Sequence, residues 1–154
     1  MDMFRGNPLS LADPMGLADG LPFNSGFLSP YPAPGQGLIM CDGDGGIRIE
    51  IGSHSWDKIK CGVVGCVYRH EFRHCSDARR ENPQVCVGGL FRETINWGEL
   101  LPETEANAHS DSVACLVEMR ELMPECGALL DTEIRENEHF RDDYLREAMR
   151  EARR

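Results

Sequence analysis

The stretch VVGCVYRHEFRHCSDARR, residues 63–80, decides the fold of this 154-residue chain. Apolar and histidine side chains recur in it at spacings of three and four residues, at Val63, Cys66, Val67, His70 and His74. This spacing places them on one face of a helix. The pair Asn82-Pro83 follows directly and should stop the helix, because the residue before a proline avoids helical backbone angles. We therefore predict a helix from Gly62 to about Arg80.

Further elements are predicted on both sides of this helix. A second helix should start near Pro102 or Glu103, where proline and acidic residues suit a first turn, and should end by Pro124. A third should run from roughly Ala128 to the C-terminus. Before the first helix, the alternation of apolar and polar residues over Ile47–Ile51 predicts a short strand. The sequence therefore predicts a mainly α fold, with a minor α+β part in which a strand or hairpin precedes the helices.

The N-terminal part of the chain differs in composition. Residues 1–46 hold most of the prolines and many glycines, which predicts a leader without helices or central strands. We place the folded domain at residues 47–154. The segment Asp42–Gly46 predicts a turn, and although it resembles a calcium loop it lacks the later bidentate glutamate.

Charge and hydropathy exclude several function classes. Asp plus Glu number 26 against 16 Lys plus Arg, for a net charge of −10. This balance argues against a nucleic-acid partner, because neutralising phosphates needs a positive field. No run of 18 apolar residues is present, so no membrane span is expected. We also expect no signal peptide, since no basic region followed by an apolar run begins the chain.

The motif His70-Glu71-Phe72-Arg73-His74 is an HExxH. One turn of helix brings two imidazoles to a common point, where they can bind Zn²⁺. Glu71 would then act as the general base towards a water bound there, and would return the proton to the leaving amine. The fold would thus contain a zincin-like active-site helix with two further helices behind it. The alternative interpretation is a solvated helix with two histidines on a polar face.

A third protein ligand has to come from another part of the chain. Asp77 and Arg80 stand where an HExxHxxGxxH enzyme has its glycine and third histidine, so that pattern is absent. Glu105, near the start of the second predicted helix, is the best candidate, and Glu103 is the next. His109 lies one turn after Glu105. It could stabilise a developing oxyanion, orient a ligand or itself bind the metal.

Seven cysteines, at positions 41, 61, 66, 75, 86, 115 and 126, predict disulfide bonds and at least one unpaired thiol. No CxxC pair is present, which argues against a four-thiolate zinc site. Cys75 with Cys86, Cys115 with Cys126, and Cys41 with Cys61 or Cys66 are plausible bridges, although sequence alone does not determine connectivity. Disulfides favour an oxidising place of work.

Two parts of the chain resemble one family. The segment Arg5–Leu17, with its Asp13-Pro14-Met15-Gly16-Leu17, resembles the junction at which the core of rearrangement-hotspot (Rhs) repeat proteins meets a variable C-terminal toxin. Residues 60–128 resemble a zinc-metallopeptidase toxin domain of such proteins. The shared features are Cys66 to His74, then Asn82-Pro83 with Cys86, then Glu105–Ala108 with Cys115-Leu116.

This resemblance implies the roles of the site residues and the setting of the protein. His70, His74 and Glu105 would bind Zn²⁺ and Glu71 would be the catalytic glutamate, whereas His109 stands where the family often has tyrosine. The protein would be an interbacterial effector that hydrolyses a peptide or protein substrate. An Rhs carrier and a type VI or related secretion machinery would deliver it into target cells, with action in the periplasm or outside the cell. A cognate immunity protein would neutralise it.

Two alternatives remain open at the level of sequence. One is a non-catalytic module, held together by metal or disulfides, that binds a partner without turnover. The other is an HExxH hydrolase that cleaves a cell-wall amide with the same residues.

Overall fold

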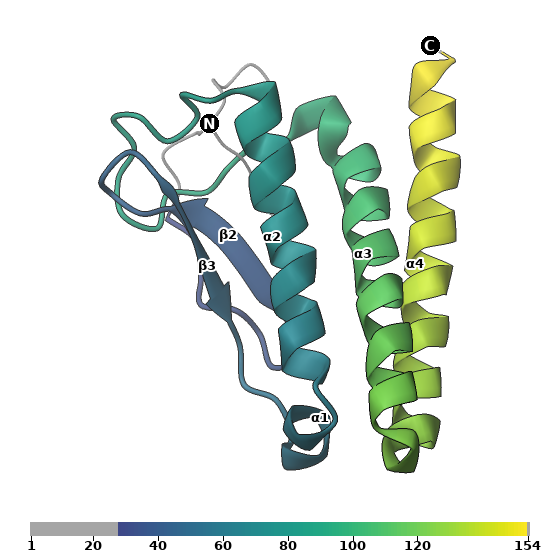
Figure 1. The fold of residues 1–154 in the computed structure, drawn as a ribbon. Helices are drawn as coiled ribbons and strands as arrows, with labels where there is room; N and C mark the ends of the chain where they lie inside the picture. The colour runs from purple at the N-terminus through teal and green to yellow at the C-terminus, as the bar shows by residue number, and fades with distance from the viewer. Residues whose placement is uncertain (1–27, 154) are drawn as a thin grey trace.

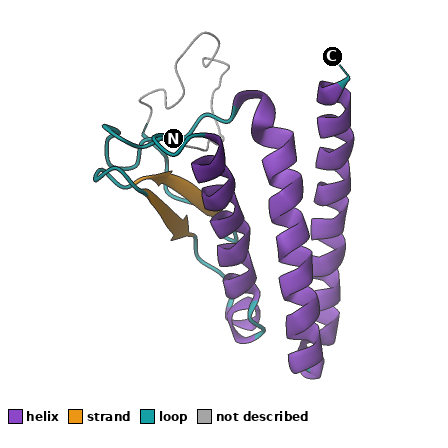
Figure 2. Ribbon diagram, turned by 45° about the horizontal axis from the view of Figure 1, so that its top comes forward, coloured by secondary structure: helices purple, strands orange, loops and turns teal. Residues whose placement is uncertain are grey.

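Three long helices and a β-hairpin form the molecule, as a computed structural model that describes residues 28–153 shows (Figure 1). In chain order the elements are β2 (Gly37–Cys41), β3 (Ile47–Ile51), α1 (Trp56–Lys60), α2 (Val63–Glu81), the 3₁₀ turn η1 (Gly98–Leu100), α3 (Leu101–Leu122), the 3₁₀ turn η2 (Pro124–Cys126) and α4 (Gly127–Ala152). Helix α3 packs between α2 and α4, while the hairpin covers the other side of α2 (Figures 1 and 2). The predicted mainly α class, with a hairpin ahead of the helices, is confirmed.

The helix boundaries follow the signals in the sequence. Helix α2 ends at Glu81, before Asn82-Pro83, and α3 carries Pro102 in its first turn. Helix α4 begins one residue before the expected Ala128. Short helix α1 was not predicted. Its start is capped by Ser55, whose Oγ accepts a hydrogen bond from the backbone N–H of Lys58.

The first strand of the hairpin comes from the segment that was expected to be a leader. Strand β3 is confirmed, but its antiparallel partner β2 lies within residues 1–46, where no central strand was expected. Both strands are edges of a two-stranded sheet, so the glycine-rich surroundings do not prevent pairing. The predicted turn connects them, and Asp42 Oδ1 accepts from the N–H groups of Asp44 and Gly46. The Rhs-like segment Arg5–Leu17 lies outside the described residues.

Two buried clusters hold these elements together. The first lies between the hairpin, the C-terminal half of α2 and the loop before α3, and contains Ile39, Cys75, Ala78, Ile95 and Trp97 among others. The second joins the N-terminal half of α2 to α3 and α4, and includes Val63, Leu116, Leu130 and Ile134. Among the helices of residues 28–153, none is both long and apolar enough to cross a membrane.

Three disulfides cross these clusters: Cys41–Cys86, Cys61–Cys126 and Cys66–Cys115. Disulfide formation and one unpaired thiol, buried Cys75, are confirmed. None of the bridges suggested from sequence is present. Two of those suggestions paired cysteines that flank a turn, whereas the bridges present link segments far apart in the sequence. Cys66–Cys115 in particular joins α2 directly to α3.

Removing the Cys66–Cys115 bridge should destabilise the protein. The Cys66→Ala/Cys115→Ala double variant should lower the free energy of unfolding by about 3 kcal/mol, because the bridge restricts the unfolded chain inside the larger loop closed by Cys61–Cys126. Urea unfolding under non-reducing conditions measures this loss. Cys75→Ala, which breaks no bridge, is the control and should cost only about 1 kcal/mol. Equal losses in the two variants would contradict the expectation.

Candidate metal centre

The two HExxH imidazoles converge on one carboxylate. His70 and His74 lie one turn apart on α2, with their ring centroids 4.9 Å apart. Glu105, on α3, places its Oε1 2.9 Å from His74 Nε2 and 3.4 Å from His70 Nε2. The structure therefore brings together the three residues expected to bind metal. Glu103, the other acidic candidate, is exposed to solvent.

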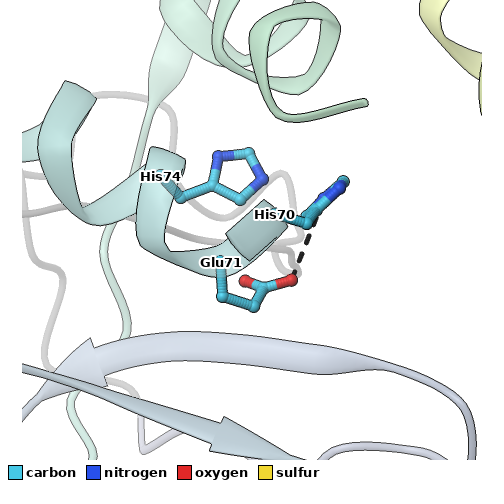
Figure 3. A group of neighbouring side chains, drawn as sticks. All are labelled: His70, Glu71 and His74. Carbon is cyan, nitrogen blue, oxygen red and sulfur yellow. Dashed lines mark ion pairs between the residues drawn. The ribbon is translucent and has the colours of Figure 1, made fainter. Parts of the chain in front are cut away.

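Glu71 lies beside this cluster, on the side of α2 that faces the hairpin (Figure 3). Its side chain is buried, and its Oε2 is 3.8 Å from His70 Nε2. Strand β2 passes so close that a Cβ added to Gly37 would meet Glu71 Cγ at 2.6 Å. Only glycine at position 37 leaves room for the glutamate in this position. The hairpin therefore sets where the carboxylate of Glu71 lies.

Hydroxyl groups hold the far side of both imidazole rings. His74 Nδ1 is 3.0 Å from Thr104 Oγ1, and that hydroxyl donates to Asp77 Oδ2 at 2.8 Å. His70 Nδ1 is 3.1 Å from Ser112 Oγ, which donates to the carbonyl oxygen of Ala108. Such outer contacts orient metal-binding histidines and leave the Nε2 atoms turned towards the ligand site.

His109 brings a third imidazole to the same place. Its ring centroid is 4.6 Å from that of His70, and its Nδ1 is 2.8 Å from Asn137 Oδ1 on α4. The rings of Phe140 and Tyr144, also on α4, stack against it. His109 is thus held between two helices, with one edge facing the HExxH histidines.

These residues could hold a metal ion. Ligand atoms of His70, Glu71 and His74 lie within 4.8 Å of one another, and so do those of His70, Glu105 and His109. Imidazole nitrogen and carboxylate oxygen are donors that suit Zn²⁺ and other divalent transition metals. The donor set therefore fits such an ion.

Burial and mutual charge shift the pKa values of the cluster. Burial lowers the pKa of His70 to about 4 and raises that of Glu71 to about 7. Burial would also lower the pKa of His74, but the charge of Glu105 and its hydrogen bond outweigh this effect and raise it. For Glu105, the reverse balance holds: His74 and His70 overcome burial, and the pKa falls well below its usual value. In the metal-free cluster, the contact between His74 and Glu105 thus favours the protonated imidazole and the ionised carboxylate.

A cavity of about 880 Å³ opens onto the cluster. Residues 34–39, which include the start of β2, line one wall, and Trp97, Phe140 and Tyr144 contribute aromatic surface. The volume lies in the range that binding sites for small molecules occupy. The cluster is therefore accessible to a ligand although Glu71 and His74 are buried.

Several residues of the site were not found from the sequence: Gly37, Asp77 as an outer partner, Thr104, Ser112, Asn137 and Tyr144. Serine, threonine and asparagine occur throughout helices, and no spacing marks those that will face a histidine on another helix. The single available signal was position, because Thr104 directly precedes Glu105 and Ser112 lies one turn after His109.

Comparison of the chain with known proteins gives no match to a family model, a curated protein or a solved structure. The resemblance to an Rhs-associated toxin domain therefore stays a prediction, and the geometry of the site carries the functional argument.

The contact between Gly37 and Glu71 predicts a large effect of a small substitution. Gly37→Ala should lower the free energy of unfolding by about 1–3 kcal/mol, because the new methyl group overlaps Glu71 Cγ. The matched control is Gly65→Ala in α2, where an added Cβ meets no atom within 4 Å. That variant should gain up to about 1 kcal/mol from higher helix propensity. Urea unfolding compares the two, and equal stabilities would contradict the predicted overlap.

The raised pKa of Glu71 makes its contribution to stability depend on pH. Because the folded-state pKa, about 7, exceeds the usual 4.5, the folded protein holds this proton more tightly than the unfolded chain does. The stability that the proton contributes is present below pH 4.5 and is lost as the pH rises through 7. In chelator-treated protein, the free energy of unfolding of Glu71→Gln relative to that of the wild type should therefore rise by up to about 3 kcal/mol between pH 4.5 and pH 8.

Denaturant unfolding at the two pH values measures this gain. Glu103→Gln, at an exposed position, is the control and should show no such gain. A Glu71→Gln variant with the same stability relative to wild type at both pH values would show that the Glu71 carboxyl is not perturbed.

Proposed function

We propose that this protein is a zinc-dependent peptidase. The single observation that carries the proposal is the convergence of His70 and His74 on Glu105, with the carboxylate of Glu71 beside them and an 880 Å³ cavity open to the cluster. Two imidazoles and one carboxylate are the donors of many catalytic zinc sites. When bound, Zn²⁺ would polarise the carbonyl of the substrate and lower the pKa of water.

Glu71 is suited to act as the general base. It is buried next to His70, and its pKa of about 7 in the metal-free protein lies near the pH at which a base works best. From this position it would take the proton of the attacking water and pass it to the departing amine. Because position 37 is glycine, strand β2 leaves room for the Glu71 side chain beside the cluster.

The outer hydrogen bonds support the same chemistry. Thr104 and Ser112 orient the two rings, and Asp77 accepts a hydrogen bond from the hydroxyl of Thr104. Arg73 and Arg80 pair with Asp77 and neutralise its charge. A site in which every ring is held from outside loses little entropy when the metal binds, which supports a pre-organised centre.

We further propose that the peptidase is a polymorphic toxin of the Rhs type. The support is the resemblance of Arg5–Leu17 to an Rhs junction together with the HExxH domain that follows. Three disulfides suit action in an oxidising compartment such as a periplasm. This proposal includes the carrier, the type VI-like route and a cognate immunity protein. Growth of bacteria that express the protein, with and without co-expression of the neighbouring genes, tests it.

A non-catalytic metal-binding module is the second candidate. The presence of His109 beside the cluster favours it, because a fourth protein donor could close the site to water. The two candidates differ in whether a small ligand can reach the metal. The spectrum of the cobalt-substituted protein should change when acetohydroxamate is added to an open site and should stay the same for a closed one.

Substitution of Glu71 tests the peptidase proposal. Glu71→Gln removes the base but keeps the size of the side chain, so kcat should fall about 10²–10⁴-fold while zinc remains bound. Cleavage of a peptide library, followed by mass spectrometry, and metal analysis by atomic emission provide the two measurements. A cell-wall peptide in the same assay distinguishes a peptidase from an amide hydrolase of that substrate.

Glu103→Gln is the control and should keep wild-type activity, because Glu103 points into solvent on the same helix as Glu105. Full activity in Glu71→Gln would contradict the assigned mechanism.

A further inference from the structure

Two aromatic side chains of α4 form a wall beside the metal cluster. Phe140 and Tyr144 lie one turn apart on this helix, and their ring centroids are 5.4 and 5.9 Å from that of His109, against which both rings stack. His109 in turn contacts His70, with 4.6 Å between the two ring centroids. This aromatic wall therefore begins directly next to an imidazole of the HExxH motif.

The rest of the protein leaves part of the aromatic wall uncovered. Phe140 is 49% exposed, and both it and Tyr144 line the cavity that opens onto the cluster. Trp97, which lines the same cavity, is only 5% exposed because it belongs to the core. The ring of Phe140 is thus in contact with water in the free protein. An apolar group of a ligand that displaces this water gains binding energy.

Apolar side chains from the other elements complete the lining of the cavity. They come from β2, α2 and α3, and are Leu38, Ile39, Val63, Val67, Leu101 and Leu116. A ligand group that rests on the aromatic wall therefore has apolar surface around it, as is usual for a binding site of small groups.

The charges in the cavity disfavour an acidic ligand. Among the described residues that line it, Lys58 is the only lysine or arginine, and its Nζ is 3.2 Å from Glu133 Oε2. Glu136, exposed on α4, lines the same cavity without an ion-pair partner among residues 28–153. An acidic side chain in this part of the cavity would approach a like charge and find no unpaired cation to balance it.

We propose that the substrate is a peptide with a large apolar side chain within two residues of the cleaved bond, and that the aromatic wall of Phe140 and Tyr144 binds this side chain. An extended peptide advances about 3.3 Å per residue, so a side chain this close to the cleaved bond can reach a ring that stacks on His109. The inference rests on the peptidase proposed above and adds the substrate class to it.

Cleavage of a mixed peptide library by the zinc-loaded full chain, followed by mass spectrometry, tests this specificity. We expect phenylalanine, tyrosine, leucine or methionine within two residues of most cleaved bonds, and we expect aspartate and glutamate to be depleted there. Cleavage at bonds without this preference would overturn the inference.

Truncation of the exposed ring tests the role of the aromatic wall. For a peptide with phenylalanine next to the cleaved bond, Phe140→Ala should lower kcat/KM about 10–100-fold, because the loss of apolar contact in a pocket has effects of this size. For the same peptide with alanine there, the loss should be less than about 2-fold. Equal losses for the two peptides would overturn the inference.

Leu145→Ala is the matched control for this variant. Leu145 is an exposed apolar residue on the same helix, 45% exposed, and it is not among the residues that line the cavity. Its substitution should leave kcat/KM unchanged for both peptides.

Binding to an inactive variant separates this inference from the peptidase proposal. Glu71→Gln should bind the phenylalanine peptide at least about 10-fold more tightly than the alanine peptide in isothermal titration calorimetry. This binding preference without cleavage by the wild type would refute the peptidase and keep the apolar site. Cleavage by the wild type without the preference would do the opposite, and the absence of both would refute both.

Discussion

The contact between one carboxylate oxygen of Glu105 and two imidazoles of α2 is the interaction on which the rest of the structure depends. It requires α3 to lie against α2 in one register, since a shift by one turn would move Glu105 about 5.4 Å away. The Cys66–Cys115 bridge fixes this register covalently, within the cluster that also holds Leu116 and Val63. Burial strengthens the attraction between Glu105 and His74, because charges interact more strongly away from bulk water.

The helices were predictable from the sequence because their signals are local. Spacing of apolar residues located α2, and Pro83, Pro102 and Pro124 marked the ends of the helices. The HExxH residues were recognisable for the same reason, since one turn of helix defines their relation. Glu105 was singled out because a zinc site needs a third donor, because the second helix offered acidic residues, and because the resemblance to a toxin family pointed to it.

Features that depend on packing between elements were not predictable. The disulfide partners were misassigned because spacing along the chain says nothing about which helices lie together. Strand β2 was missed because glycines and prolines surround a short apolar run that becomes a strand only when β3 pairs with it. The outer partners of the histidines depend on the same inter-helix register, so Ser112 and Asn137 look like ordinary polar helix residues until α2, α3 and α4 are placed together.

Two of the bridges, Cys61–Cys126 and Cys66–Cys115, lie at one end of the three-helix layer, where α2 begins, α3 ends and α4 starts (Figure 1). At the opposite end, α4 finishes at Ala152 with no covalent tie to α2 or α3 among the described residues. The three helices are therefore cross-linked at one end only. Any separation of α4 from α2 and α3 must be smallest at the cysteines and increase towards Met149. His109 on α3 and Tyr144 on α4 lie beyond the cross-linked end. A small change in the angle between these two helices therefore alters the width of the cavity.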